Sequence, residues 1–129
     1  MNKKEFLSII KSEVKDKDKP IRLVIRPKRG DRLKLGCGIT LVTPADKRET
    51  IFISNAFSRK RPIMTVNQFI EQFPIENVYD NFSITAMINY FNGKSNGSLV
   101  LHELTDNDGM VIIENKNLVN ILIYLEYIR

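Results

Sequence analysis

The sequence predicts an α+β fold in which a mostly antiparallel sheet is packed by an N-terminal, a central and a C-terminal helix. Apolar residues recur at helical spacing near both ends of the chain. Between residues 20 and 54 they alternate with polar residues, as in half-buried strands. A capping-box pattern, Thr65 followed by Gln68, opens a central helix. With 129 residues, 43% of them hydrophobic, the chain is expected to form a single compact domain over residues 1–129.

The N-terminal helix is expected over residues 2–15, with its lysines and serines turned away from the core. The next two runs are expected to pair as a hairpin that has one apolar and one basic face. The apolar face would carry Ile21, Leu23, Ile25, Leu33, Leu35, Cys37, Ile39 and Leu41. The basic face would carry Arg22, Arg26, Arg32 and Lys34, beside Gly36 and Gly38. A third strand is expected over residues 50–54.

The second half of the chain is expected to contain more helix than strand. A helix should run from Thr65 to Phe73 and stop at Pro74. Residues 80–93 fit both a helix and a strand, and we assign them to a helix. Residues 97–114 read as a hairpin. The apolar run 115–129 is assigned to a buried C-terminal helix, which would also offer one route to a homodimer.

Charge is distributed unevenly along the chain. Residues 15–62 hold 14 Lys and Arg against five Asp and Glu, whereas residues 63–129 hold three against eight. A cationic region of this kind attracts polyanions, although a solvated lysine-rich surface is the plainer interpretation. The candidate polyanion-binding or partner-binding residues are Arg22, Arg26, Lys28, Arg29, Arg32, Lys34, Lys47, Arg48, Arg59, Lys60 and Arg61.

Few aromatic residues accompany these cations. Phe52 and Phe57 are the nearest ones, and the chain has no Trp. Base stacking and base readout need exposed aromatic or planar groups, whereas contacts to phosphates need only charge. The sequence therefore favours contact with the nucleic-acid backbone, or with an acidic protein that handles nucleic acid.

No catalytic residue, cofactor or metal site is predicted. Cys37 and His102 are the sole residues of their types, and each falls in a strand pattern that is typical of buried or packed positions. A zinc site needs three or four ligands. Asp106 and Asp108, near Glu114, have the residue types expected of a tight turn.

A short stretch, Asn55 to Ser58, resembles the strand-then-turn opening of a small viral ring-nuclease family that degrades cyclic oligoadenylates. In that family the stretch lies at the N-terminus, whereas here about fifty residues precede it. The resemblance implies that Ser58 would contact the ligand and that His102 could act as the acid. It covers four of the 129 residues.

We therefore expect a small non-enzymatic binding protein of a reducing, cytoplasmic compartment, with no membrane partner. Its partner would be nucleic acid or an acidic, nucleic-acid-handling protein. Small basic proteins of this kind are often carried by phages or mobile elements, where inhibition of a host defence nuclease is one form of such binding. Two alternatives stay open: an enzyme acting on a nucleotide or cyclic oligonucleotide, and a self-assembling protein that pairs its basic middle with its acidic C-terminal half.

Overall fold

The computed structural model describes residues 1–27, 35–55, 64–91, 97–105 and 110–125. Among these residues it contains seven strands, two α-helices and two short 3-10 helices. In chain order they are α1 (Lys3–Glu13), β1 (Ile21–Pro27), β2 (Leu35–Ala45), η1 (Asp46–Arg48), β3 (Thr50–Asn55), α2 (Val66–Glu71), η2 (Asn77–Tyr79), β4 (Ser83–Phe91), β5 (Gly97–Glu103), β6 (Val111–Glu114) and β7 (Val119–Leu125). None of the helices in this part of the chain is long and apolar enough to cross a membrane.

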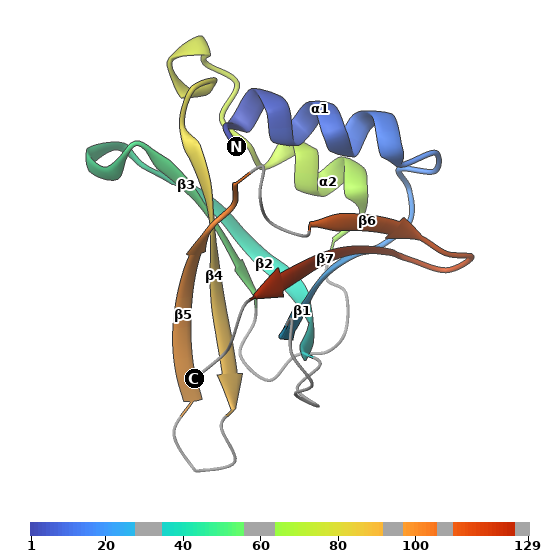
Figure 1. The fold of residues 1–129 in the computed structure, drawn as a ribbon. Coiled ribbons are helices and arrows are strands. Elements are labelled where there is room, and N and C mark those ends of the chain that lie inside the picture. The colour runs from blue at the N-terminus through green and yellow to red at the C-terminus, as the bar shows by residue number, and fades with distance from the viewer. Residues whose placement is uncertain (28–34, 56–63, 92–96, 106–109, 126–129) are drawn as a thin grey trace.

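The seven strands form one curled, mixed sheet in the order β5-β4-β3-β2-β1-β7-β6 (Figure 1). β3 and β4 run parallel, as do β1 and β7, and the other neighbours are antiparallel. The predicted fold class is therefore wrong in two respects. The sheet is mixed, and the C-terminal segment is a strand of that sheet instead of a third helix.

The C-terminal segment is predicted to be a helix because its apolar residues recur at helical spacing, and a buried one because it is apolar nearly all round. In the structure β7 lies between β1 and β6, so both of its edges are paired. Ile121 and Ile123 face the core and are almost wholly buried, and Leu122 on the opposite face is 7% exposed. A strand that is buried on both faces reads as a continuous apolar run, which periodicity cannot distinguish from a buried helix. Because residues 119–125 form β7, the C-terminal helix through which a homodimer was expected is not formed there.

The segment 80–93 was also assigned to a helix, and it forms β4. The buried residues Ile84 and Ala86 alternate toward the core, with the β-branched Thr85 between them. The expected hairpin over residues 97–114 is wrong as well. Its two runs are strands, but β5 pairs with β4 and β6 pairs with β7, at opposite edges of the sheet. Alternating apolar residues specify a strand, whereas its partner depends on which neighbouring face completes the core.

The β1–β2 hairpin pairing is confirmed, with Arg22 opposite Gly38 in an antiparallel register. The predicted apolar face of β2 is only partly correct. The register shifts between Ile39 and Leu41, where a β-bulge adds one residue. Beyond the bulge the inward residue is Val42, which is 6% exposed, while Leu41 points outward and is 48% exposed.

Both described α-helices begin at a capping box. Thr65 and Gln68 form the predicted box of α2, in which each side chain bonds the other residue's backbone amide. Asn2 and Glu5 do the same for α1. The two helices lie side by side at one end of the sheet (Figure 1), where Phe6 packs edge-on against Phe69 with ring centroids 6.2 Å apart. We call this region the helical end.

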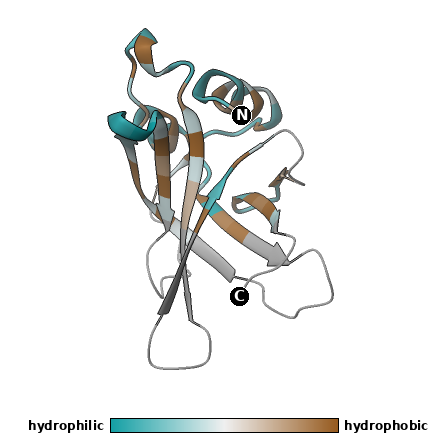
Figure 2. Ribbon diagram, turned by 60° about the vertical axis from the view of Figure 1, so that its left-hand side comes forward, coloured by the Kyte–Doolittle hydropathy of each residue, from teal (hydrophilic) through white to brown (hydrophobic). Residues whose placement is uncertain are grey.

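The core lies between the helices and the concave face of the sheet. Figure 2 colours the described strands largely brown and white, with teal gathered on helical segments and turns. The largest fully buried side chains come from both helices and from most of the strands; they are Phe6, Ile10, Ile21, Ile39, Ile51, Phe69, Ile84, Leu104, Ile121 and Ile123. Helices and sheet therefore share one hydrophobic core.

Candidate binding surfaces

The described part of the predicted basic face is formed by neighbouring positions of β1 and β7. Arg22 of β1 is half-buried, and its Nε donates a 3.0 Å hydrogen bond to Oδ1 of Asn120 on β7. Gly38 is its neighbour on β2 and adds no side chain beside it. The Asn120 bond uses the Nε–H donor and so fixes the orientation of the guanidinium plane.

The centre of this face, between the β1 positions of Arg22 and Arg26, is apolar. Val24 lies on the same face as Arg22 and is only 1% exposed. Its partner on β7 is Leu122, which is also buried. The next outward position of β7 is Tyr124, which is half-buried and pairs with Arg26. Sequence reasoning missed Tyr124 as part of this face because it placed the C-terminal segment in a helix.

The strand register also shows where the two most cationic segments of the sequence leave the sheet. Leu35 is opposite Ile25, near the end of β1, and Asn55 at the end of β3 is opposite Ile39 of β2. The ends of β1 and β3 and the start of β2 therefore lie at one end of the sheet. We call this the cationic end. It lies away from the helical end, which holds the starts of β1 and β4.

Several predicted binding residues lie outside the described residues. They are Lys28, Arg29, Arg32 and Lys34 in the segment after β1, and Arg59, Lys60 and Arg61 in the segment after β3. For Arg26 the structure gives the backbone position in β1. Ser58, Asp106 and Asp108 also lie outside the described residues.

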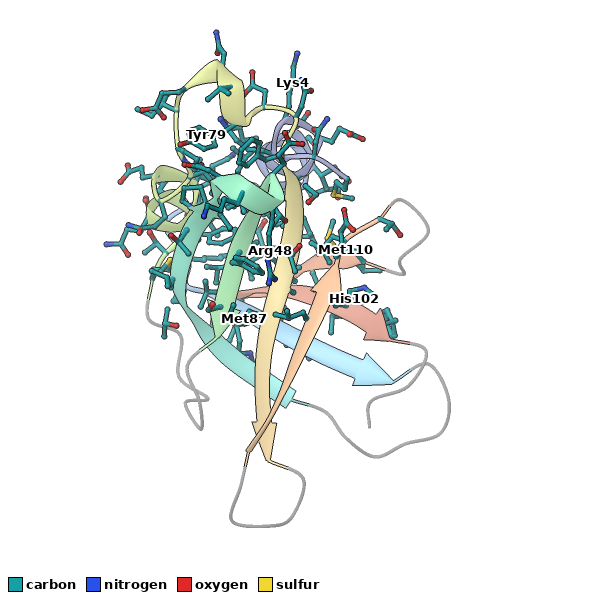
Figure 3. All side chains as sticks on the ribbon, turned by 90° about the vertical axis from the view of Figure 1, so that its left-hand side faces the viewer. Lys4, Arg48, Tyr79, Met87, His102 and Met110 are labelled. Carbon is teal, nitrogen blue, oxygen red and sulfur yellow. The ribbon has the colours of Figure 1, made fainter. Side chains whose placement is uncertain are left out.

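Lys47 and Arg48 do not join the cationic end. They are exposed residues of η1, at the far end of β2, where Arg48 is labelled in Figure 3. Gly38 lies near the cationic end of β2, and Ala45 is its last residue before η1. The two are seven residues apart, which corresponds to ~23 Å along the strand. Their neighbourhood also contains Asp46, whose carboxylate, with burial, raises the pKa of Tyr79 above its ordinary value. This acid offsets part of the local positive charge.

The register separates the sole cysteine from the sole histidine. The cross-strand register runs from His102 of β5 through β4 and β3 to Val42 of β2, so these two residues are three strands apart in the sheet. Cys37 lies five residues before Val42 on β2, ~16 Å along the strand. A direct Cys–His pair is therefore not formed. Among the described residues, no group of His, Cys, Asp and Glu could hold a metal ion.

Glu114 contacts the chain between α1 and β1. Its carboxylate is 2.8 Å from Nζ of Lys19 and accepts hydrogen bonds from the backbone amides of Lys15 and Asp16. The Lys19 bond, followed by the Lys15 amide, lowers the pKa of Glu114 to about 2. These contacts fasten β6 to the connection between α1 and β1.

A groove at the helical end was not anticipated from the sequence. It is an open groove of about 870 Å³ between α1 and the chain that follows α2. Leu7, Ile70 and Phe73 contribute its apolar floor, and Lys4 and Lys11 are exposed on the α1 side. In the sequence, the pointer to this groove is the spacing of Lys4 and Lys11, which places both on one side of the first helix. We call it the helical groove.

Comparison with known proteins gives no relatives: no family model, no curated protein and no solved structure matches this chain.

Proposed function

We propose that the protein binds nucleic acid through the cationic end of the sheet, mainly by contacts to phosphates and without catalysing a reaction. The observation that supports this most directly is the strand register. It brings together the ends of β1 and β3, which lead into segments 28–34 and 56–63. The first segment has four cations and one acid, and the second has three cations and no acid. Multiple cations near one place are what phosphate binding requires.

Residues of the adjacent sheet face support a preference for single strands. Phe52, one of the two aromatics near the cations in sequence, is 9% exposed and unsuited to stacking. Tyr124 is more accessible and is the cross-strand neighbour of Arg26. A single partly exposed ring, at the β7 position paired with Arg26, offers one stacking position, which suits an unpaired base better than a duplex.

The test is the salt dependence of binding to a fluorescent single-stranded oligonucleotide and to its duplex. We expect affinity to fall steeply with salt, because each phosphate contact releases counterions. Replacing Arg59, Lys60 and Arg61 together by Ala should lower the slope of log K against log salt by about 2. The matched control replaces Lys47 and Arg48 by Ala. These residues are exposed cations at the opposite end of the sheet and should leave the slope unchanged.

A second variant separates stacking from charge. Tyr124→Ala should weaken single-strand binding by about tenfold without changing the salt slope, whereas Tyr124→Phe should retain the affinity. Duplex binding should be unaffected by either substitution. No salt-sensitive binding at low ionic strength would refute the proposal. Equal effects of the loop variant and of the Lys47/Arg48 control would refute the cationic end as the site.

A further inference from the structure

We propose that the helical groove is a docking site for an acidic, amphipathic helical segment of a partner protein. This surface lies at the end of the molecule away from the cationic end, so the inference does not rest on nucleic-acid binding.

The floor of the groove is apolar and accessible. Leu7 and Ile70 are half-buried, although both pack against the core cluster. Beyond them Ile75 follows Pro74 and is 89% exposed. Val78, also in this part of the chain, is 69% exposed. Isolated exposed apolar residues are common, but Ile75 lines an open apolar groove, where it can serve as the anchor for a partner.

The two sides of the groove are joined by hydrogen bonds of Lys3. The ammonium of Lys3, with its side chain only 8% exposed, donates to the carbonyl oxygen of Pro74 at 2.6 Å and to Oδ1 of Asp80 at 3.2 Å. These bonds join the start of α1 to both ends of the segment that carries Ile75. A groove that is held open in the free protein binds a segment without first being ordered.

The rim has a charge pattern that a partner can complement. Lys4 and Lys11 are exposed on the α1 side, and neither forms an ion pair with any described residue. They are seven residues apart, or two helical turns and ~10 Å along α1. Glu71 stands exposed on the α2 side. Two cations on one wall and one acid on the other favour an acidic segment and fix its orientation.

The occupant that fits is therefore a helix with an apolar stripe and two carboxylates spaced two turns apart. Its apolar side chains would lie on Leu7, Ile70 and Ile75, as in other helix-in-groove complexes. The carboxylates would face Lys4 and Lys11. A nucleic acid would leave the apolar floor unused, and a second copy of the chain offers no described helix with this pattern, since α1 carries lysines there.

The experiment selects peptides about four helical turns long from a random display library against the full chain. We expect the enriched peptides to be acidic, with apolar residues at helical spacing and two carboxylates seven positions apart. Binding should weaken by about tenfold or more for Ile75→Ser and for the double substitution Lys4→Glu and Lys11→Glu. Amide shifts in the labelled protein should concentrate at the helical groove.

The matched control is the double substitution Lys47→Glu and Arg48→Glu, which changes the same net charge outside the groove and should leave binding unchanged. Circular dichroism checks that each variant is folded. A peptide in which lysines replace the carboxylates should bind the Lys4→Glu/Lys11→Glu variant better than the wild type. Peptides that are not acidic, or that ignore all groove variants, would overturn the proposal. So would a groove-dependent homodimer, or binding to vesicles of phosphatidylcholine and phosphatidylserine that needs Ile75 and Val78.

Discussion

The side-chain ammonium of Lys3 lies 3.2 Å from a carboxylate oxygen of Asp80, 77 residues further along the chain. The same ammonium donates to the carbonyl oxygen of Pro74. Lys3 is 6% exposed, although the helical pattern places it among outward-facing lysines. Its long apolar stem is buried while its charged head finds two acceptors, so the burial is compensated.

Removing this ammonium should destabilise the protein more than removing an exposed one. Lys3→Ala leaves the Pro74 carbonyl and the Asp80 carboxylate without their shared donor, and should lower the free energy of unfolding by about 2 kcal/mol. The matched control Lys4→Ala, one residue along the same helix, should change it by less than about 0.5 kcal/mol. Urea unfolding measures both. Equal effects of the two substitutions would contradict the buried role of Lys3.

Acid should loosen the contact between β6 and the chain after α1. Ionised Glu114 is favoured in the folded state, where its pKa is about 2 against an ordinary value of 4.5. A depressed pKa contributes stability that is fully present above about pH 4.5 and is lost as the pH falls toward about 2. Glu114→Gln should remove this part of the pH dependence.

The measurement is urea unfolding of wild type and variant at a series of acidic pH values. The two curves should converge at the lowest pH, because the wild-type carboxyl is then protonated. Glu103→Gln is the control, since Glu103 is exposed on β5 and its carboxylate forms no hydrogen bond or ion pair within the described part of the chain. Parallel curves for Glu114→Gln and wild type would show that Glu114 does not contribute.

The two capping boxes should contribute similar amounts to the free energy of unfolding. Asn2→Ala removes the side-chain oxygen that accepts from the Glu5 amide, and Thr65→Ala removes the one that accepts from the Gln68 amide. Each should lower the unfolding free energy by about 1 kcal/mol. Ser8→Ala, in the exposed middle of α1, should be neutral or slightly stabilising because alanine is the better helix former. A comparable loss for Ser8→Ala would argue against a specific capping effect.

The β-bulge of β2 can be tested with one pair of substitutions. Val42→Thr puts a hydroxyl into the core and should cost about 1–3 kcal/mol. Leu41→Thr changes an outward side chain and should cost less than about 0.5 kcal/mol. Thermal or urea unfolding decides between them. The reverse order would mean that the strict alternation of the sequence, with Leu41 inside, holds in the protein.

Local signals in the sequence predicted the elements that short-range chemistry specifies. The Thr65 helix start follows from side chains that bond amides three residues away. The β1–β2 pairing follows from two alternating runs joined by a turn sequence. Of the candidate binding residues, Arg22 lies on the expected outer face of the sheet, whereas Lys47 and Arg48 lie at the other end of the sheet.

The remaining features depend on contacts between distant parts of the chain. An apolar run such as residues 119–125 can be buried as a helix or as a central strand. It becomes β7 because β1 and β6 satisfy its backbone on both edges. The same long-range pairing sends β5 and β6 to opposite edges of the sheet and brings Tyr124 beside Arg26. The helical groove likewise exists only where Lys3 joins α1 to Pro74 and Asp80.

Composition and spacing settle which residues are apolar, charged or capping, since these are properties of short stretches. The partner of each strand is settled by burial and hydrogen bonding across the whole chain. These free-energy contributions arise between segments that are distant in sequence, so no local pattern reveals them.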